Sequence, residues 1–301
     1  MKNEKWKTSW ISPSNIALVK YWGKKPVQIP ANPSLSMTLN KAYTEMTVDV
    51  EPLEGKEDIP HVDFHFEGKK NQKFEAKIQD FLWSLFDEFP ELGECKYRIS
   101  SRNTFPHSTG IASSASSMSA LGLCLADLLT NTGEVQPDQD FYRLASRLSR
   151  LASGSACRSV YGGYVIWGNL PHFPQTSDEY AVPVPFEIHP AMQAMNDAIL
   201  VVSGREKEVS SRAGHSLMHS HPFADARFES AVKNILALGE ALTSGDFERF
   251  VQITESEALT LHALMMTSNP SFFLFEPNTV NIVKKVRQFR KETSIPVCFT
   301  L

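Results

Sequence analysis

The sequence predicts a globular protein of two lobes that contains both strands and helices. Its 301 residues, 42% of them hydrophobic, can form a large core, and this length favours two domains or two lobes over one. Strand-like alternation prevails near the start of the chain, whereas helical spacing of apolar residues prevails near its end. A proline-rich stretch from Pro171 to Pro190 is the expected boundary between the lobes.

The first hundred residues are expected to form mainly strands. Runs rich in β-branched and aromatic residues predict strands over 6–15, 44–50, 62–66 and 95–102. We expect the second and third of these to be antiparallel strands. Apolar residues at helical spacing predict one helix in this part of the chain, over 73–89.

Helices are expected to dominate the rest of the chain. One helix should run from Met118 to Leu129. A second helix is expected over 136–150, because Pro137 lies near its start and arginines lie toward its end, as capping and the helix dipole favour. The remaining expected elements are helices over 225–242, 246–266 and 277–291 and strands over 197–203 and 296–301.

Composition narrows the range of partners. A net charge of −4 gives no general attraction for nucleic acid or for an anionic membrane. The longest apolar runs fall well short of the roughly 18 to 20 residues that a membrane span requires. The charged N-terminus lacks the apolar segment and cleavage site of a signal peptide, so we expect a cytoplasmic protein.

Cysteine and histidine positions do not predict a metal centre. The four cysteines are widely separated, with no Cys-x-x-Cys pair, so neither a zinc site nor a disulfide framework is expected and the thiols should be reduced. His215, His219 and His221 lie close together, but no carboxylate or cysteine accompanies them with a ligand pattern. A partly exposed helix end explains these histidines, and no metal ligands are predicted.

The stretch from Pro106 to Leu129 is a candidate anion site. Small hydroxyl residues from Ser113 to Ser119 lead into a helix former that continues to Leu129. Unpaired N–H groups and the positive end of the helix dipole would converge there and attract a phosphate, and small side chains around Ser114 would let it approach the backbone. A buried helix whose serines and alanines permit tight packing explains the stretch equally well.

Two further segments could hold anions. Lys20, Lys24 and Lys25 lie within six positions and are interrupted by Tyr21, which suits a shaped wall, although a solvated basic loop is the alternative. Between Ser153 and Arg158 a hydroxyl-rich loop carries one guanidinium, which can bond two oxygens of a carboxylate or phosphate at once. An arginine that caps backbone carbonyls is the alternative for that loop.

These segments together resemble the diphosphomevalonate decarboxylase family of the GHMP kinase superfamily. The motif Asn15-Ile-Ala-x-x-Lys20-Tyr21-Trp-Gly-Lys24 is close to diagnostic of that family, and Ser153-Gly-Ser-Ala-Cys-Arg158 followed by Tyr-Gly-Gly is nearly as specific. Val209-Ser-Ser211 and the segment from Leu261 to Pro270 also resemble their counterparts. The similarity covers essentially the whole chain.

The resemblance implies an α+β fold of two lobes and an assembly. The N-terminal lobe, residues 1–187, would resemble ribosomal protein S5 domain 2 and carry the ATP phosphate loop, and the C-terminal lobe, residues 188–301, would be ferredoxin-like. A homodimer is the family's expected state.

The resemblance also implies the reaction. ATP and Mg²⁺ would serve phosphorylation of the tertiary hydroxyl of mevalonate 5-diphosphate, after which loss of phosphate and carbon dioxide gives isopentenyl diphosphate. Arg158 would bind the departing carboxylate, and Arg158, Lys20 and Ser114 are the expected catalytic residues. The expected nucleotide-binding residues are Pro106, Gly110, Ala112, Ser113, Ser114 and Ser116. The expected substrate-binding residues are Asn15, Tyr21, Lys24, Ser153, Ser155, Arg158 and either or both of Ser210 and Ser211.

The sequence departs from the family's pattern in two places. His107, Ser108 and Ser117 replace residues that are usual near the nucleotide, so the nucleotide contacts are expected to differ in detail. The family's catalytic Asp directly follows a strand like Val297 to Leu301, so we expect the sequence to represent an incomplete protein. A mevalonate 5-phosphate decarboxylase, a mevalonate 3-kinase and a non-catalytic phosphate-binding relative are the alternatives.

Overall fold

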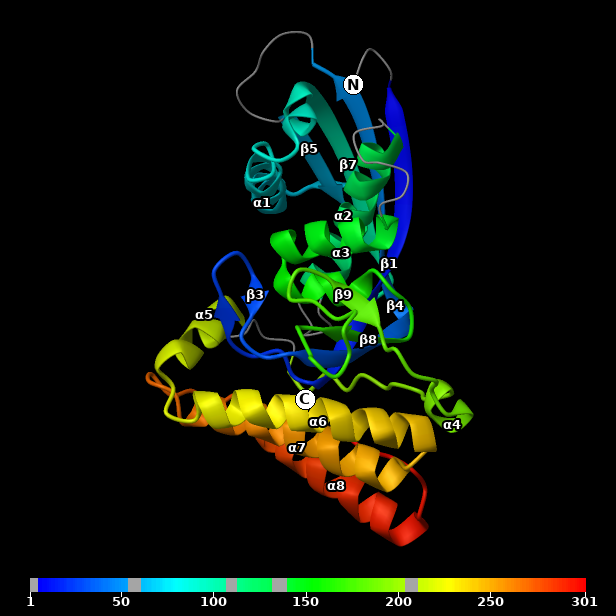
Figure 1. The fold of residues 1–301 in the computed structure, drawn as a ribbon, viewed down its shortest axis with the longest axis vertical. Helices are drawn as coiled ribbons and strands as arrows, with labels where there is room; N and C mark the ends of the chain where they lie inside the picture. The colour runs from blue at the N-terminus through cyan, green and yellow to red at the C-terminus, as the bar shows by residue number, and fades with distance from the viewer. Residues whose placement is uncertain (1–4, 54–60, 107–112, 132–139, 204–210) are drawn as a thin grey trace. The chain divides into compact units, whose positions relative to one another are not determined.

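The protein is described by a computed structural model that covers residues 5–53, 61–106, 113–131, 140–203 and 211–301 (Figure 1). The chain divides into two compact units, neither of which is one continuous segment. Unit 1 comprises residues 1–15 and 38–162, and unit 2 comprises residues 16–37 and 163–301. Within the described ranges, no helix has both the length and the apolar character needed to cross a membrane.

Unit 1 contains a mixed sheet whose strands are ordered β6-β5-β7-β4, with β1 also paired with β4. The central pair, β4 and β7, is antiparallel, with Val48 opposite Ile99. β5 runs parallel to β7, with Phe64 opposite Ile99. The strands are β1 (Trp6–Val19), β4 (Ser34–Pro52), β5 (His61–Phe66), β6 (Lys69–Lys70) and β7 (Cys95–Asn103), and the ends of β1 and β4 continue into unit 2.

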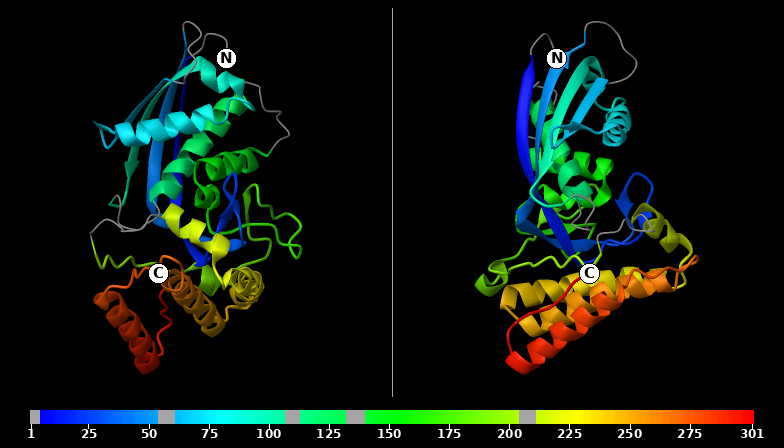
Figure 2. Two further views of the ribbon diagram at one scale, coloured as in Figure 1. Left: turned by 90° about the vertical axis from the view of Figure 1, so that its left-hand side faces the viewer. Right: turned by 180° about the vertical axis from the view of Figure 1, so that it is seen from behind.

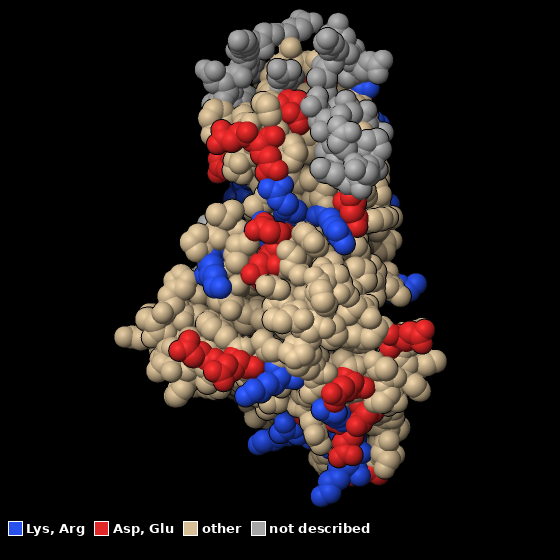
Figure 3. All heavy atoms as spheres, viewed as in Figure 1, with Lys and Arg blue, Asp and Glu red and all other residues tan. Residues whose placement is uncertain are grey.

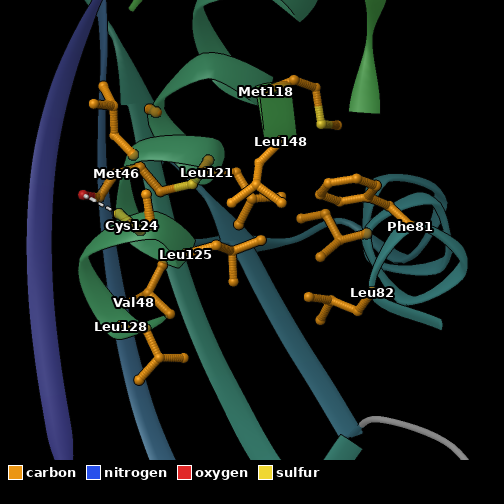
Figure 4. Packing of buried hydrophobic residues seen from close by; sticks show 14 of the residues in the cluster. Met46, Val48, Phe81, Leu82, Met118, Leu121, Cys124, Leu125, Leu128 and Leu148 are labelled. Atoms are coloured by element: carbon orange, nitrogen blue, oxygen red, sulfur yellow. Dashed lines mark hydrogen bonds between the residues drawn. The ribbon is translucent and has the colours of Figure 1, made fainter. Parts of the chain in front are cut away.

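Helices cover one face of the unit 1 sheet (Figure 2). Every second residue of β4 and β7 faces these helices, as strand geometry dictates, and the buried side chains interdigitate (Figure 4). Cys124 donates from its Sγ to the carbonyl of Met46 and so joins a helix to the sheet. The helices are α1 (Gln72–Trp83), α2 (Ser113–Asn131) and α3 (Phe141–Ala152), with short 3-10 turns η1 (Pro90–Glu94) and η2 (Gly154–Ser159).

Unit 2 is mainly helical. Residues Ser34–Met37 of β4 pair with β8, which pairs with β9, and a small hairpin joins β2 to β3. The long helices α6, α7 and α8 lie side by side (Figures 1 and 2). The strands are β2 (Lys24–Lys25), β3 (Ile29–Pro30), β8 (Tyr164–Trp167) and β9 (Ala181–Pro183). The helices are α4 (Pro190–Gln193), α5 (Ser211–Ser216), α6 (Ala224–Ser244), α7 (Phe247–Met266) and α8 (Pro277–Thr293), with a 3-10 turn η3 (Leu217–Ser220).

The structure confirms most of the expected elements and corrects several. The four expected N-terminal strands form, and β4 and β5 run in opposite directions as expected, although they are not neighbours: each pairs with β7, β4 antiparallel and β5 parallel. The helix expected over 73–89 already ends at Trp83, where tight turns begin and the Ser84 hydroxyl donates to the Phe81 carbonyl at 2.6 Å. Helix α3 starts at Phe141 because Asp140 caps it by accepting the Tyr142 N–H.

Two expected strands are wrong. Residues 195–203 and 296–301 are described but form no strand. Ile199, Leu200 and Val201 are 43%, 63% and 53% exposed, so these apolar residues have no partner strand to bury them among the described residues. Their composition suits a strand, but β structure requires a neighbour that supplies hydrogen bonds.

Candidate functional site

The structure places the expected site residues in both compact units. Unit 1 holds Asn15, the loop from Ser153 to Arg158, and the start of α2. Unit 2 holds Lys20, Tyr21 and Lys24, together with Ser211 as the first residue of α5. Gly110, Ala112, Ser210 and the departures His107 and Ser108 lie outside the described residues.

Arg158 is the buried cation of the loop after α3. It lies on η2 and is only 3% exposed, and its Nε and Nη2 donate to Asn15 Oδ1 at 3.4 and 3.3 Å. The Asn15 amide is itself held, because its Nδ2 donates to Ser159 Oγ at 2.7 Å and to the Ser155 carbonyl at 3.3 Å. Asn15 thus orients a buried guanidinium without neutralising its charge.

The loop that carries Arg158 follows directly from α3. Ser153 ends this helix in an extended conformation, its N–H donates to the Ser149 carbonyl, and its own carbonyl accepts the Ala156 N–H at 2.7 Å. Ser153 and Ser155 are partly exposed, whereas Ala156 is buried, so the two hydroxyl residues are accessible beside the buried arginine.

Cys157 lies next to the arginine but is not suited to nucleophilic chemistry. The Cys157 side chain is fully buried and its Sγ donates to the Gly154 carbonyl at 3.0 Å. Burial raises the pKa of the Cys157 thiol to about 12, although the charge of Arg158 opposes this shift. The thiol is therefore neutral at physiological pH.

Helix α2 is described from Ser113 onward, and its first described turn contains no acidic residue. Ser113 is partly exposed and Ser114 is exposed, whereas Ser116 is fully buried. The Ser116 hydroxyl forms a hydrogen bond with Thr44 Oγ1 on β4 at 2.7 Å, and this bond attaches the described start of α2 to the sheet. The Ser117 hydroxyl bonds the Ser113 carbonyl at 2.7 Å. Pro106 lies just before the undescribed segment and is exposed.

The segment after β1 carries Lys20 and Tyr21. Lys20 is only 6% exposed, and its Nζ donates to Thr300 Oγ1 at 2.7 Å and to the Leu301 carbonyl at 2.8 Å. The Tyr21 ring packs between aromatic rings, with centroids 4.3 Å from His215 and 4.7 Å from Trp167. These contacts support the shaped wall, not the solvated loop, for Lys20 and Tyr21.

Lys24 is on the β2–β3 hairpin and is more exposed than Lys20. Its Nζ donates to Gln28 Oε1 at 3.1 Å, and its carbonyl bonds His219 Nε2 at 2.8 Å. Val27 and Gln28 form the tip of the hairpin with φ values of 56° and 59°. Lys25 is exposed, so the solvated-loop alternative describes Lys25 but not Lys20.

Residues that the sequence did not single out hold the Lys20 backbone. Glu257 Oε2 accepts the Lys20 N–H at 2.9 Å, and Arg227 Nη2 donates to the Lys20 carbonyl at 2.8 Å. Asn32 Nδ2 donates to the same carbonyl at 2.9 Å. A signal for Glu257 did exist: it lies at helical spacing from Phe250 and Ile253, on the core-facing side of α7.

The three histidines have different partners in the structure. His215 packs against the Tyr21 ring and its Nδ1 accepts the Gly23 N–H at 3.0 Å, whereas His221 Nε2 bonds the Leu264 carbonyl at 3.0 Å. Among the residues whose positions are described, no group of three or more His, Cys, Asp or Glu side chains could hold a metal ion.

The charges are mixed on the face of the molecule seen in Figure 3, where Lys and Arg lie among Asp and Glu. Two of the cationic groups described above, Arg158 and Lys20, are instead buried and held by hydrogen bonds. Such groups can orient anionic oxygens without reorganising, which is the arrangement that phosphoryl transfer and carboxylate binding require.

Comparison with known proteins gives consistent matches over most of the chain. Residues 12–178 match a family described as the diphosphomevalonate decarboxylase-like N-terminal domain, and residues 198–301 match the mevalonate 5-diphosphate decarboxylase C-terminal domain. A diphosphomevalonate decarboxylase from Candida albicans is 31% identical over 93% of this chain and 78% of its own length.

Solved structures agree with these matches. A mevalonate diphosphate decarboxylase from Staphylococcus aureus is 29% identical, with a TM-score of 0.81 over 99% of this chain and 85% of its own. A protein designated MDDEF, solved in complex with MVAPP, AMPPCP and magnesium, is 28% identical, with a TM-score of 0.77 over 99% of this chain and 86% of its own.

Proposed function

The chain belongs to the diphosphomevalonate decarboxylase family, and from that premise we propose that it catalyses the ATP-dependent decarboxylation of mevalonate 5-diphosphate to isopentenyl diphosphate. The fold is the two-lobed α+β fold of the GHMP kinases. Such a reaction would place the protein in the mevalonate pathway of isoprenoid biosynthesis. Its products besides isopentenyl diphosphate are ADP, phosphate and carbon dioxide.

The observation that carries this proposal is the oriented, buried guanidinium of Arg158. Asn15, which accepts its hydrogen bonds, is neutral and does not cancel the positive charge that would attract the carboxylate that leaves as carbon dioxide. Fixing that carboxylate would select the geometry from which the carbon–carbon bond breaks. Ser153 and Ser155, partly exposed on the same loop, are proposed to bind neighbouring substrate oxygens.

The start of α2 fits a nucleotide phosphate. The exposed Ser114 and partly exposed Ser113 lie at a helix N-terminus that carries no acidic side chain in its first turn. ATP with Mg²⁺ supplies the phosphoryl group and neutralises phosphate charge when bound. We propose that Pro106, Gly110, Ala112, Ser113 and Ser114 surround the nucleotide, that Ser114 is catalytic, and that the buried Ser116 supports them through Thr44.

The substrate's diphosphate is proposed to bind near the segment after β1. Lys20 offers a fixed ammonium, Tyr21 a fixed ring, and Lys24 a second ammonium. Charge neutralisation by these lysines favours a doubly phosphorylated substrate over a monophosphate. Lys20 is proposed as a catalytic residue, and Ser210 and Ser211 as further substrate contacts.

Product analysis tests the proposal and separates it from its alternatives. With mevalonate 5-diphosphate and ATP, the protein should release carbon dioxide and ADP in equal amounts. ADP release without carbon dioxide would indicate a mevalonate 3-kinase, preference for mevalonate 5-phosphate would indicate the monophosphate decarboxylase, and neither product would indicate a non-catalytic relative.

Arg158→Ala tests the assigned role of the guanidinium. We expect kcat/KM to fall about 100-fold or more, because hydrogen bonds to a charged group contribute about 1.5–3 kcal/mol each and two are lost. The circular dichroism spectrum should be unchanged. Release of carbon dioxide by this variant at the wild-type rate would exclude Arg158 as the carboxylate ligand.

We also propose the assembly, location and lobe boundary that the family resemblance implied. The protein would act as a homodimer in the cytoplasm, which sedimentation and fractionation can check. A lobe boundary near residue 187 is supported by the two family matches, which end at residue 178 and resume at residue 198.

A further inference from the structure

The segment from Lys20 to Gly23 has no regular secondary structure, yet its main chain is held at nearly every step. Buried side chains bind the Lys20 N–H and carbonyl, the Trp22 N–H and the Gly23 N–H. The Gly23 carbonyl accepts the Ala31 N–H at 3.2 Å. Buried main-chain groups must find partners, and here most of the partners are side chains and not a neighbouring strand, so a few individual residues determine where this segment lies.

The principal holding group is a buried ion pair. Arg227 and Glu257 face each other as a two-pronged pair at 2.7 and 2.8 Å, with side chains only 2% and 1% exposed. Asn234 donates a further hydrogen bond to Glu257 Oε1. Buried ion pairs are costly to desolvate and are poor evidence for stability alone. Here both partners bind the main chain of Lys20: Glu257 accepts its N–H and Arg227 donates to its carbonyl.

Asn32 adds a second restraint on either side of Tyr21. Its Nδ2 donates to the Lys20 carbonyl at 2.9 Å and its Oδ1 accepts the Trp22 N–H at 3.3 Å. One amide therefore fixes the peptide groups before and after Tyr21. The ring of Tyr21 is held as well, by a tilted contact with the His215 ring at a centroid distance of 4.3 Å, while His215 Nδ1 accepts the Gly23 N–H.

We propose that Arg227, Glu257 and Asn32 are positioning residues that hold Lys20 and Tyr21 in the geometry that binds the diphosphate of the substrate. This proposal rests on the proposed function of the Lys20 segment as a diphosphate site. The ion pair fixes the backbone from which the ammonium of Lys20 extends, and Asn32 fixes the direction of the Tyr21 side chain. Preorganisation of this kind removes the entropic cost of ordering the ligands when the anion binds.

The test is a double-mutant cycle of Glu257→Gln with Lys20→Met on the full chain. The first readout is the dissociation constant of inorganic diphosphate, measured by isothermal titration calorimetry, which does not depend on turnover. The second readout is kcat and KM for mevalonate 5-diphosphate. Glu257→Gln keeps the side chain's shape but removes the charge that organises Arg227, and we expect diphosphate to bind about tenfold more weakly.

The chain supplies a matched control. Glu255 is also on α7, is 4% exposed and pairs with Arg287 and Arg290, but none of its hydrogen bonds reaches the Lys20 segment. Glu255→Gln should lower the melting temperature by a comparable amount and leave diphosphate binding within about twofold of the wild type. Asn32→Ala serves if Glu257→Gln does not fold, and it should weaken diphosphate binding in the same direction.

The cycle separates positioning from general stabilisation. If Glu257 acts through Lys20, then Glu257→Gln in the Lys20→Met background should change the dissociation constant by less than about twofold. An equal loss in both backgrounds, an equal loss in Glu255→Gln, or no diphosphate binding by the wild type would overturn the proposal. Absence of carbon dioxide release alone would instead refute the decarboxylase function and leave the binding cycle to be judged on its own result.

Discussion

Asn15→Asp is the most informative single change at the carboxylate site, because it alters charge with almost no change of shape. Asn15 Oδ1 lies 3.4 and 3.3 Å from Nε and Nη2 of Arg158. A carboxylate there would attract the guanidinium with about 5 kcal/mol at an effective dielectric constant of about 20. The substituted side chain would then compete with the substrate's carboxylate for the same cation.

Even a small part of that attraction would have a large effect on substrate binding. If about a quarter of it remains after desolvation, substrate affinity falls about tenfold. We therefore expect KM for mevalonate 5-diphosphate to rise about tenfold or more, with kcat/KM falling in proportion. Some stability should be lost, because the introduced carboxylate cannot donate to the Ser155 carbonyl as the Asn15 amide does, but the fold should survive, since the carboxylate would still accept from Arg158 and the Ser159 hydroxyl can rotate to donate to it.

Steady-state assays of carbon dioxide release, together with thermal denaturation, measure both effects. Ser12→Ala is the matched control, because Ser12 is also buried on β1 and donates to the Ser159 carbonyl at 2.9 Å without a hydrogen bond to the guanidinium. That control should lose about 1 kcal/mol of stability and keep its KM. A wild-type KM in folded Asn15→Asp, or an equal rise in Ser12→Ala, would refute the assignment of Arg158 to the substrate carboxylate.

Two further predictions concern unit 1. Burial raises the pKa of Cys157 from 9.0 to about 12, so the unfolded thiol ionises first and the stability that this thiol contributes, up to about 4 kcal/mol, is present below pH 9 and lost as pH rises through 12. Urea denaturation at pH 8 and pH 11 measures this effect: the unfolding free energy should fall less between these pH values in Cys157→Ala than in the wild type. Equal falls in the two proteins would contradict the pKa shift. Gly122→Ala should destabilise the protein by about 1–3 kcal/mol, because its new Cβ would lie 2.9 Å from the Ala145 carbonyl of α3. Gly162→Ala, with nothing within 4 Å, is the control, and an equal melting temperature for both variants would show that α2 and α3 can separate.

The helical part of the fold could be predicted because its signals are local. The expected helix over 225–242 corresponds to α6, whose end is set by Gly245 at a φ of 79°, and the helix over 277–291 begins at Pro277 as expected. Periodicity and capping residues contain this information within a few turns of chain. Boundaries erred mainly where a side chain acted as an unforeseen cap, as Asp140 does for α3.

Strand assignments failed where they depended on partners far away in sequence. Residues 195–203 are apolar and suited to a strand, yet nothing among the described residues pairs with them. β5 forms as expected, but composition could not show that its neighbour would be β7, to which it runs parallel, because that relation depends on how α1 connects them. Composition determines which residues can enter a sheet, and only the tertiary fold selects their neighbours.

The candidate site divides in the same way. Arg158 and Lys20 could be found because each stands in a short motif with neighbours of the expected type. Glu255 and Glu257 show what a motif cannot supply: both are buried acids on α7, and both pair with arginines. Glu255 faces Arg287 and Arg290 of α8, whereas Glu257 accepts the Lys20 N–H. Glu255 and Glu257 are only two positions apart on α7, but they point in different directions around the helix. One joins two helices and the other binds the backbone of Lys20, a candidate site residue, and only the folded chain shows this difference.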